Sequence, residues 1–227
     1  METQERLNNI LHDEVILKNK LNIKDQERLL EREKLITAIK AMYYFDSSIR
    51  QLDFNIERLA ETNKYLIGDI YDFAGKIRDI DMIHLDYFEK HKNLIDFTSA
   101  NNIKNEFDTL MYNLNQNYTY YTDIEKKYIL CASMADLYHI HPFYRANSLS
   151  IVLYMNDYAK NNLNINLDIY KLVNEYDIEQ LLCNFCLGQQ IDLVNAIIDV
   201  DISEKEKNNF HDILSKNEIE QDDELEI

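Results

Sequence analysis

The residues of this chain best suited to chemistry lie in one short run, His-Pro-Phe-Tyr-Arg-Ala-Asn-Ser-Leu at 141–149, which contains the only proline of 227 residues. Imidazole is the side chain that changes charge nearest to neutral pH, so His141 can serve as a general base. Pro142 disfavours a helical backbone at the residue before it, which predicts an extended His141 with its ring at the mouth of a loop. For a lone histidine, a place in the core is the alternative.

The run at 141–149 resembles the signature of the Fic family, also called Fido or Fic/Doc, which has the pattern His-Pro-Phe-x-acid-Gly-Asn-Gly-Arg. His141, Phe143 and Asn147 match this pattern. A second stretch, Asp-Ile-Tyr-Asp-Phe-Ala-Gly-Lys-Ile-Arg at 69–78, is similar to a run that precedes the signature in the same family. Two matches in the family's order argue against chance, and the resemblance implies a mainly helical Fic fold with a small β-hairpin.

Composition also favours an all-α, mainly helical fold. The chain has three glycines and one proline, far below ordinary usage of about 7% and about 5%, so few residues can punctuate strands and turns. Apolar spacing and capping residues predict helices near 25–45 (with Asp25 as N-cap), 64–75, 101–116, 123–137, after Ser148 or a neighbour, near 168–187, near 190–199, and from Ser203. We expect an N-terminal helical extension at 1–58, a Fic-like core at 59–200, and a C-terminal helix with an acidic tail at 201–227.

In Fic proteins a hairpin called the flap holds an extended segment of the target beside the signature loop. Two short β-compatible pieces, at 83–85 and 94–98, occupy the corresponding place in this sequence. The resemblance assigns Ile95, Phe97 and Thr98 to the flap and to target binding. An ordinary surface hairpin is the alternative.

Within the family, the signature transfers AMP from ATP to a hydroxyl group of a target protein, with Mg²⁺ held by the acid of the motif. The resemblance makes His141 the catalytic base and places Arg145, Asn147 and Ser148 nearest the nucleotide phosphates. Arg145, however, stands where the family has the metal-binding acid. Two unit charges about 4 Å apart interact by about 4 kcal/mol at an effective dielectric near 20, so a reversed sign opposes a cation and no metal ligand is predicted.

Two further substitutions alter the phosphate cradle, which the family builds from backbone N–H groups at a helix N-terminus. Ser148 adds a Cβ where the family has glycine, and Leu149 supplies no guanidinium. We therefore expect ATP with Mg²⁺ in intact family members but not here. Arg145 could still contact a phosphate without metal, and Asn147 could contact phosphate, hold the loop's shape or bond its own backbone.

These substitutions predict a degenerate Fic-domain protein, a pseudoenzyme with weak or no AMP transfer (AMPylation), that binds or regulates an active Fic relative or another protein partner. The alternative is a working nucleotidyl- or phosphate-group transferase with an altered donor or altered metal use. The N-terminal helices could also form a dimerisation or antitoxin-like module, as in toxin–antitoxin pairs. A homo-oligomer therefore stays open.

Net charge, the length of the apolar runs and the number of cysteines indicate which partners, location and thiol state to expect. Lys plus Arg number 24 and Asp plus Glu number 41, giving a net charge of −17 that repels nucleic acid and anionic lipid. The longest apolar runs fall far short of the roughly 20 residues of a membrane-spanning helix, so no membrane partner and a cytoplasmic location are expected. Cys131, Cys183 and Cys186 are odd in number and are expected to be reduced, buried thiols.

Overall fold

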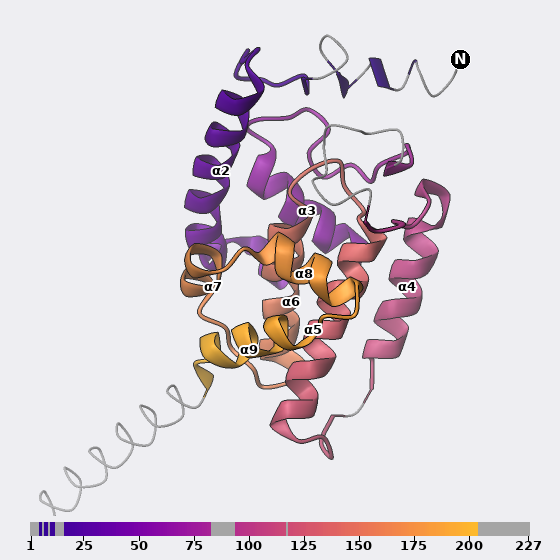
Figure 1. The fold of residues 1–227 in the computed structure, drawn as a ribbon, viewed down its shortest axis with the longest axis vertical. Coiled ribbons are helices and arrows are strands. Elements are labelled where there is room, and N and C mark those ends of the chain that lie inside the picture. Colours follow the sequence, from indigo (N-terminus) through magenta and orange to yellow (C-terminus); the bar gives the residue numbers. More distant parts are fainter. Residues whose placement is uncertain are drawn as a thin grey trace, which may run out of the picture.

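The computed structural model describes residues 5, 7, 8, 10, 11, 16–82, 94–116 and 118–203. Within them the chain is helical, which confirms the predicted fold class, and β-structure is limited to two isolated bridges, Leu11–Leu17 and Leu167–Asp201 (Figure 1). The α-helices are α2 (Gln26–Tyr43), α3 (Ile56–Ile67), α4 (Ile103–Leu114), α5 (Asp123–Ile140), α6 (Asn147–Asn162), α7 (Ile169–Glu175), α8 (Ile178–Cys186) and α9 (Ile191–Val200). The 3-10 helices are η1 (Tyr44–Asp46), η2 (Ser48–Gln51) and η4 (Ala100–Asn102).

Helix α6 forms the centre of the core, with α2 and α4 at opposite sides of the molecule (Figure 1). Every residue from Ser150 to Ala159 is buried, so the helix is covered around its whole circumference. α3 and α5 pack directly on α6, while α4, α8 and α9 pack on α5. The signature run, which directly precedes α6, is therefore attached to the most buried element of the fold.

Several helix ends follow the predicted capping chemistry. Asp25 accepts a hydrogen bond from the backbone N–H of Arg28 at 2.8 Å, which confirms it as the N-cap of α2. Thr122 and Glu125 form a capping box at the start of α5. α4, α5 and α9 lie where the sequence predicts helices.

Two predicted helices have different bounds. The helix expected at 64–75 is α3, which ends at Ile67; turns follow, and Gly75 has φ +75°, a backbone conformation that does not continue a helix. The single helix expected at 168–187 is two helices, α7 and α8. Asp168 and Asp177 each accept a hydrogen bond from a backbone N–H three residues later, so each begins a new helix.

The predicted hairpin flap is not confirmed. Its first strand, 83–85, lies outside the described residues. Residues 94–98 have no strand pairing, and the backbone N–H of Thr98 donates instead to the carbonyl oxygen of His139 at 3.1 Å, near the end of α5. The predicted C-terminal helix and acidic tail lie outside the described residues beyond Ser203.

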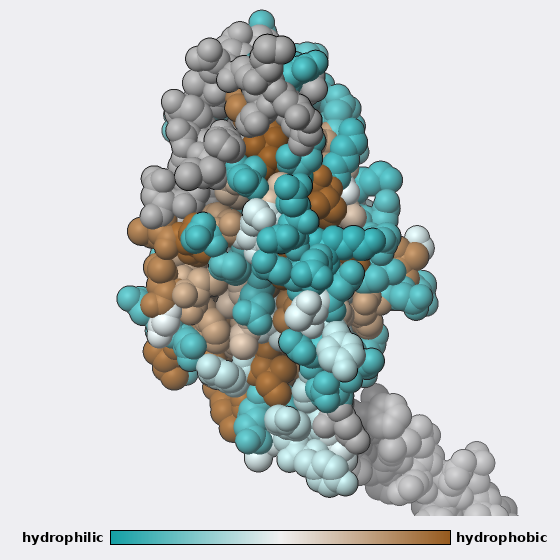
Figure 2. Space-filling view, turned by 90° about the vertical axis from the view of Figure 1, so that its right-hand side faces the viewer, coloured by the Kyte–Doolittle hydropathy of each residue, from teal (hydrophilic) through white to brown (hydrophobic). Residues whose placement is uncertain are grey.

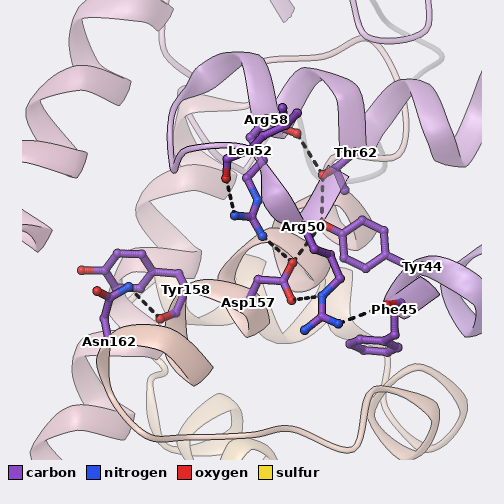
Figure 3. A network of polar contacts seen from close by, with 9 residues as sticks. All are labelled: Tyr44, Phe45, Arg50, Leu52, Arg58, Thr62, Asp157, Tyr158 and Asn162. Carbon is purple, nitrogen blue, oxygen red and sulfur yellow. Dashed lines mark hydrogen bonds and ion pairs between the residues drawn. The ribbon is translucent and has the colours of Figure 1, made fainter. Parts of the chain in front are cut away.

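A buried carboxylate on α6 holds the segment that follows α2 (Figure 3). Asp157 is 2% exposed and accepts hydrogen bonds from Arg58 Nη2 at 2.6 Å, Arg50 Nε at 2.9 Å and the Tyr44 hydroxyl at 3.2 Å. Burial is the main cause that raises the pKa of Tyr44 to about 12. These contacts join η1, η2 and α3 to α6, so α2 is followed by a segment fixed to the core.

The three cysteines are free thiols, as predicted. Cys131 and Cys183 are buried and Cys186 is partly buried. Burial raises the pKa of the Cys131 and Cys186 thiols to about 12, which disfavours the reactive thiolate. Their role is therefore packing.

Candidate functional site: the signature loop

The signature loop, residues 141–146, joins α5 to α6, and a residue with positive φ stands at each end. His141 has φ +48° and ψ +61°, and Ala146 has φ +58°. The extended backbone predicted for His141 is therefore wrong. Because α5 continues to the preceding residue, His141 occupies its C-cap, where a left-handed backbone lets its N–H reach the carbonyl oxygen of Leu137 at 3.0 Å.

The imidazole of His141 is fully buried, at 0% exposure. Its ring centroid lies 4.2 Å from that of Phe97 and 5.3 Å from that of Tyr138, and its Nδ1 lies 3.2 Å from the Tyr138 carbonyl oxygen. A general base must come within about 3 Å of the hydroxyl oxygen that it deprotonates. A target hydroxyl can approach this imidazole only where the surrounding rings give way.

Asn147 holds the shape of the loop. Its Oδ1 accepts a hydrogen bond from the backbone N–H of Phe143 at 2.9 Å, and its Nδ2 donates to the Phe143 carbonyl oxygen at 2.8 Å. This is one of the three roles that the sequence leaves open. Ser148 is partly exposed in the first turn of α6, and Leu149 packs against the hydrophobic core.

Arg145 forms a bidentate ion pair with Glu33 of α2. Its Nη2 lies 2.7 Å from Glu33 Oε1, and its Nε lies 3.2 Å from both carboxylate oxygens. The Tyr71 hydroxyl donates to Glu33 Oε2 at 2.6 Å. The side chains of Arg145 and Glu33 are 20% and 9% exposed, so the pair is largely withdrawn from water. Burial first, and then the Glu33 carboxylate, raise the pKa of Tyr71 far above its usual range, which keeps the phenol a donor.

The buried guanidinium of Arg78 binds backbone carbonyl groups at the start of the same loop. It is 1% exposed, its Nε donates to the His141 carbonyl oxygen at 2.7 Å, and its Nη1 donates to the Ile80 carbonyl oxygen at 3.0 Å. Its Nη2 donates to the carbonyl oxygens of Thr98 and Ile140. Burial lowers the pKa of Arg78 to about 10. One guanidinium therefore joins the end of α5, the start of the loop and the segment at 94–98.

Asn63 of α3 joins the loop to the second family-like stretch. Its Nδ2 donates to the Arg145 carbonyl oxygen at 2.8 Å, and its Oδ1 accepts from the backbone N–H of Gly75 at 2.9 Å. A Cβ at Gly75 would come within 2.9 Å of the Ala60 carbonyl oxygen, so a close approach as well as φ requires glycine there. The run at 69–78 thus packs directly beside the signature.

The three residues assigned to the flap lie next to the imidazole without forming a strand. Phe97 is half-buried against His141, while Ile95 and Thr98 are buried. The Thr98 backbone is bonded on both sides, by its N–H to His139 and by its carbonyl oxygen to Arg78. The structure brings this segment to the loop, and target binding by it stays a prediction.

Sequence reasoning did not identify Glu33, Asn63, Tyr71 or Arg78 as parts of the site. Tyr71 and Arg78 belong to the family-like stretch at 69–78, and that match was the available signal for them. Glu33 carried no signal, because one acid in a helix rich in alternating charges is ordinary. The contact between Glu33 and Arg145 depends on how α2 packs against the loop, which the sequence does not indicate.

The loop does not fit a divalent cation. Its acid position is Arg145, and two carboxylates of the described residues that contact the loop are already bound: Glu33 by Arg145, and Asp79 by the hydroxyl of Tyr144. Across residues 16–82, 94–116 and 118–203, and the few described before them, no group of three His, Cys, Asp or Glu side chains could hold a metal ion.

A cavity is also present in the described part of the chain, away from the loop. This cavity of about 640 Å³ lies between α2 and α7, lined in part by Ala41, Met42, Tyr170 and Val173. The opposite side of the molecule, where α4 lies, has both hydrophilic and hydrophobic regions (Figure 2). No described helix is both long enough and apolar enough to span a bilayer.

No protein-family model matches the chain. Over 87 residues it is 30% identical to the "Probable protein adenylyltransferase Fic" of Escherichia coli (strain K12), a match that spans 35% of this chain and 42% of that relative. The structure is similar to BepC of Bartonella tribocorum with bound AMPPNP, with a TM-score of 0.68 and 20% identity over 86% of this chain and 96% of that one.

It is also similar to the N-terminal Fic domain of a Bep effector of Bartonella quintana with bound ADP. That likeness has a TM-score of 0.70 and 18% identity, over 86% of this chain and 94% of that chain. At these identities the likeness to both structures shows the fold. The chain therefore has the fold of a Fic domain, and its resemblance to the Fic family is confirmed.

Proposed function

We propose that this chain is a Fic-domain protein with weak or no AMP transfer, which acts by binding a protein partner, either an active Fic relative or another protein. The observation that carries the proposal is the ion pair between Arg145 and Glu33. It occupies the place where the resemblance expects a metal-binding acid. A nucleotide with its metal would meet a guanidinium that is already neutralised by a carboxylate, instead of a free acid.

The energy needed to open this pair weighs against nucleotide binding. Separating one partner of a fully buried ion pair costs about 3–5 kcal/mol, because it leaves a charge without compensation, and the 20% exposure of the Arg145 side chain lowers this to about 2–3 kcal/mol. A ligand with a Kd of about 1 mM gains only about 4 kcal/mol on binding. A nucleotide that had to displace Glu33 from Arg145 would therefore lose much of an ordinary affinity.

The rest of the loop supports the same proposal. The imidazole of His141 is covered by Phe97, so the base is not presented to a target hydroxyl. Leu149 packs on the core and brings no positive charge to a phosphate. The BepC and Bep structures are described with bound AMPPNP and ADP, so the fold accommodates nucleotides in those proteins, whereas Arg145 and Leu149 of this chain depart from the family's signature.

A transferase that uses Arg145 as a metal-free phosphate contact is the alternative. It requires Arg145 to turn away from Glu33, to which it is joined by three contacts of 2.7–3.2 Å. We therefore propose the binding function alone.

The test is transfer of label from ATP to protein in the presence of Mg²⁺. Wild type and His141→Ala should label a panel of candidate proteins equally, at background. A variant with the family's pattern, Glu33→Gln with Arg145→Glu, Ser148→Gly and Leu149→Arg, should gain nucleotide binding. Labelling by wild type that His141→Ala abolishes would overturn the proposal.

A second version of the same assay tests whether the chain regulates an active Fic relative. An active Fic protein is given ATP and its target, with and without the wild-type chain at matched concentration. A changed labelling rate supports regulation of an active relative. An unchanged rate, with no complex seen by sedimentation, removes that version and leaves another protein as the partner.

A further inference from the structure

Helix α2 lies at the left edge of the molecule in Figure 1, and several of its large apolar side chains are exposed. Four of them recur at the spacing of one helix face and form what we call the α2 ridge: Leu35 (51% exposed), Ile39 (48%), Met42 (58%) and Tyr43 (62%). Met42 also lines the cavity between α2 and α7. The buried face of the same helix holds smaller or polar residues in part: Leu29, Glu33, Thr37 and Ala41.

A surface helix normally turns its apolar face to the core and its polar face to water. In α2 four large apolar side chains face water instead. Single exposed apolar side chains are ordinary, but a contiguous row of four rimmed by charges is typical of an interaction surface. Such interfaces have an apolar centre and a polar rim. The ridge has both parts.

Charged side chains are exposed at both ends of the ridge. Arg28 and Arg32 are exposed on the N-terminal side of the ridge, and Asp46 is exposed beyond its C-terminal end. Asp46 belongs to η1, which continues directly from α2 because Tyr44 keeps a right-handed helical backbone, with φ −58° and ψ −34°. Glu27 and Glu31 are exposed on the same turns as these arginines. Arg32 and Asp46 are therefore the residues that place opposite charges at the two ends of the ridge.

Arg32 and Asp46 stand at equal distances in sequence on either side of Ile39, about two helical turns away. A two-fold axis through Ile39 would bring two α2 helices together in antiparallel orientation. Arg32 of one copy would then meet Asp46 of the other, twice, and Leu35 would meet Tyr43. A surface that is complementary to itself in this way fits a second copy of the same chain.

We infer that the chain forms a symmetric homodimer through the α2 ridge, with antiparallel α2 helices centred on Ile39. The inference goes beyond the proposed function and is independent of it. The ridge faces away from the core, whereas Glu33, which pairs with the signature loop, lies on the buried face of the same helix. A failed dimer test leaves the nucleotide question untouched, and the converse also holds.

The first experiment measures mass against concentration by sedimentation equilibrium at physiological salt, where the Debye length is about 8 Å and repulsion between two chains of charge −17 is screened. Wild type should be a dimer. Ile39→Lys should weaken the dimer by at least about tenfold, because a charge would be buried in the apolar centre. The matched control is Ile198→Lys on α9, where the isoleucine is 45% exposed, and it should change nothing.

The second experiment reverses the charges. Arg32→Glu and Asp46→Arg should each weaken the dimer, because like charges then meet at both contacts. The double variant and an equimolar mixture of the two single variants should both restore it, since opposite charges meet again. All three residues changed in the ridge and its rim are exposed or half-exposed, so circular dichroism should show unaltered folding.

A monomeric wild type at every concentration would overturn the inference. A dimer that Ile198→Lys disrupts and Ile39→Lys does not would overturn it too. If neither the double variant nor the mixture restores association, the antiparallel pairing is wrong.

Discussion

Replacing Glu33 by glutamine removes the charge that Arg145 faces while keeping the shape of the side chain. Three contacts of 2.7–3.2 Å join the two residues, and the Glu33 side chain is 9% exposed. Loss of one partner from a buried pair costs about 3–5 kcal/mol. Because the Arg145 side chain is 20% exposed, water partly compensates its charge, and we expect a smaller cost of about 2–3 kcal/mol.

For a chain of this size, 1 kcal/mol corresponds to a change in Tm of about 2–4 °C, so Glu33→Gln should lower Tm by about 4–12 °C. Urea unfolding gives the free energy directly. The matched control is Glu61→Gln, which breaks the exposed pair between Glu61 and Lys64 at 3.1 Å and should cost less than about 0.5 kcal/mol.

A double-mutant cycle completes the test. Glu33→Gln combined with Arg145→Gln should be more stable than the sum of the single changes predicts, by at least about 1 kcal/mol, because no unpaired charge then remains. If Glu33→Gln costs no more than Glu61→Gln, or if the two changes add, the pair is not coupled as described and the reasoning fails.

Two other changes test the residues that hold the loop, and a third tests the buried contacts of Asp157. Arg78→Met should lower the free energy of unfolding by about 3–5 kcal/mol, measured in urea, because four carbonyl oxygens lose their donor; Arg78→Lys should rescue little of it, since an ammonium cannot span them. Asn147→Ala should cost about 1–3 kcal/mol in the same assay through the Phe143 backbone groups, and an effect within error would refute the loop-shaping role. Burial favours the neutral Tyr44 phenol, raising its pKa to about 12 from 10, so its contribution of about 2–3 kcal/mol is present below pH 10 and lost as pH rises through about 12. Tyr44→Phe should flatten that part of the stability profile, whereas Tyr120→Phe, at a 91% exposed position, should leave it unchanged.

The fold was largely accessible from local sequence signals. Scarce glycine and proline predict helices, and Asp25 predicts where α2 begins; the structure confirms both. The errors arose where side chains compete for the backbone. Asp177 begins a new helix inside an apolar pattern that suggests one continuous helix, and turns after Ile67 end α3 before its apolar spacing does.

The site was less accessible, because its important contacts are long-range. The motif located His141, Arg145 and Asn147, but not what they touch. The partners Glu33 and Arg78 lie 112 and 63 positions away in the chain from the groups that they bond. Burial of His141 under Phe97 likewise depends on how the segment at 94–98 packs, which no local pattern encodes.

The most direct test of the central claim is calorimetric titration of the wild-type chain with ATP in the presence and absence of Mg²⁺. With Arg145 paired to Glu33 in place of a metal-binding acid, we expect no Mg²⁺-dependent binding. Saturable binding of ATP that requires Mg²⁺ and is lost in a variant of the loop, such as Asn147→Ala with its fold intact by circular dichroism, would contradict the account.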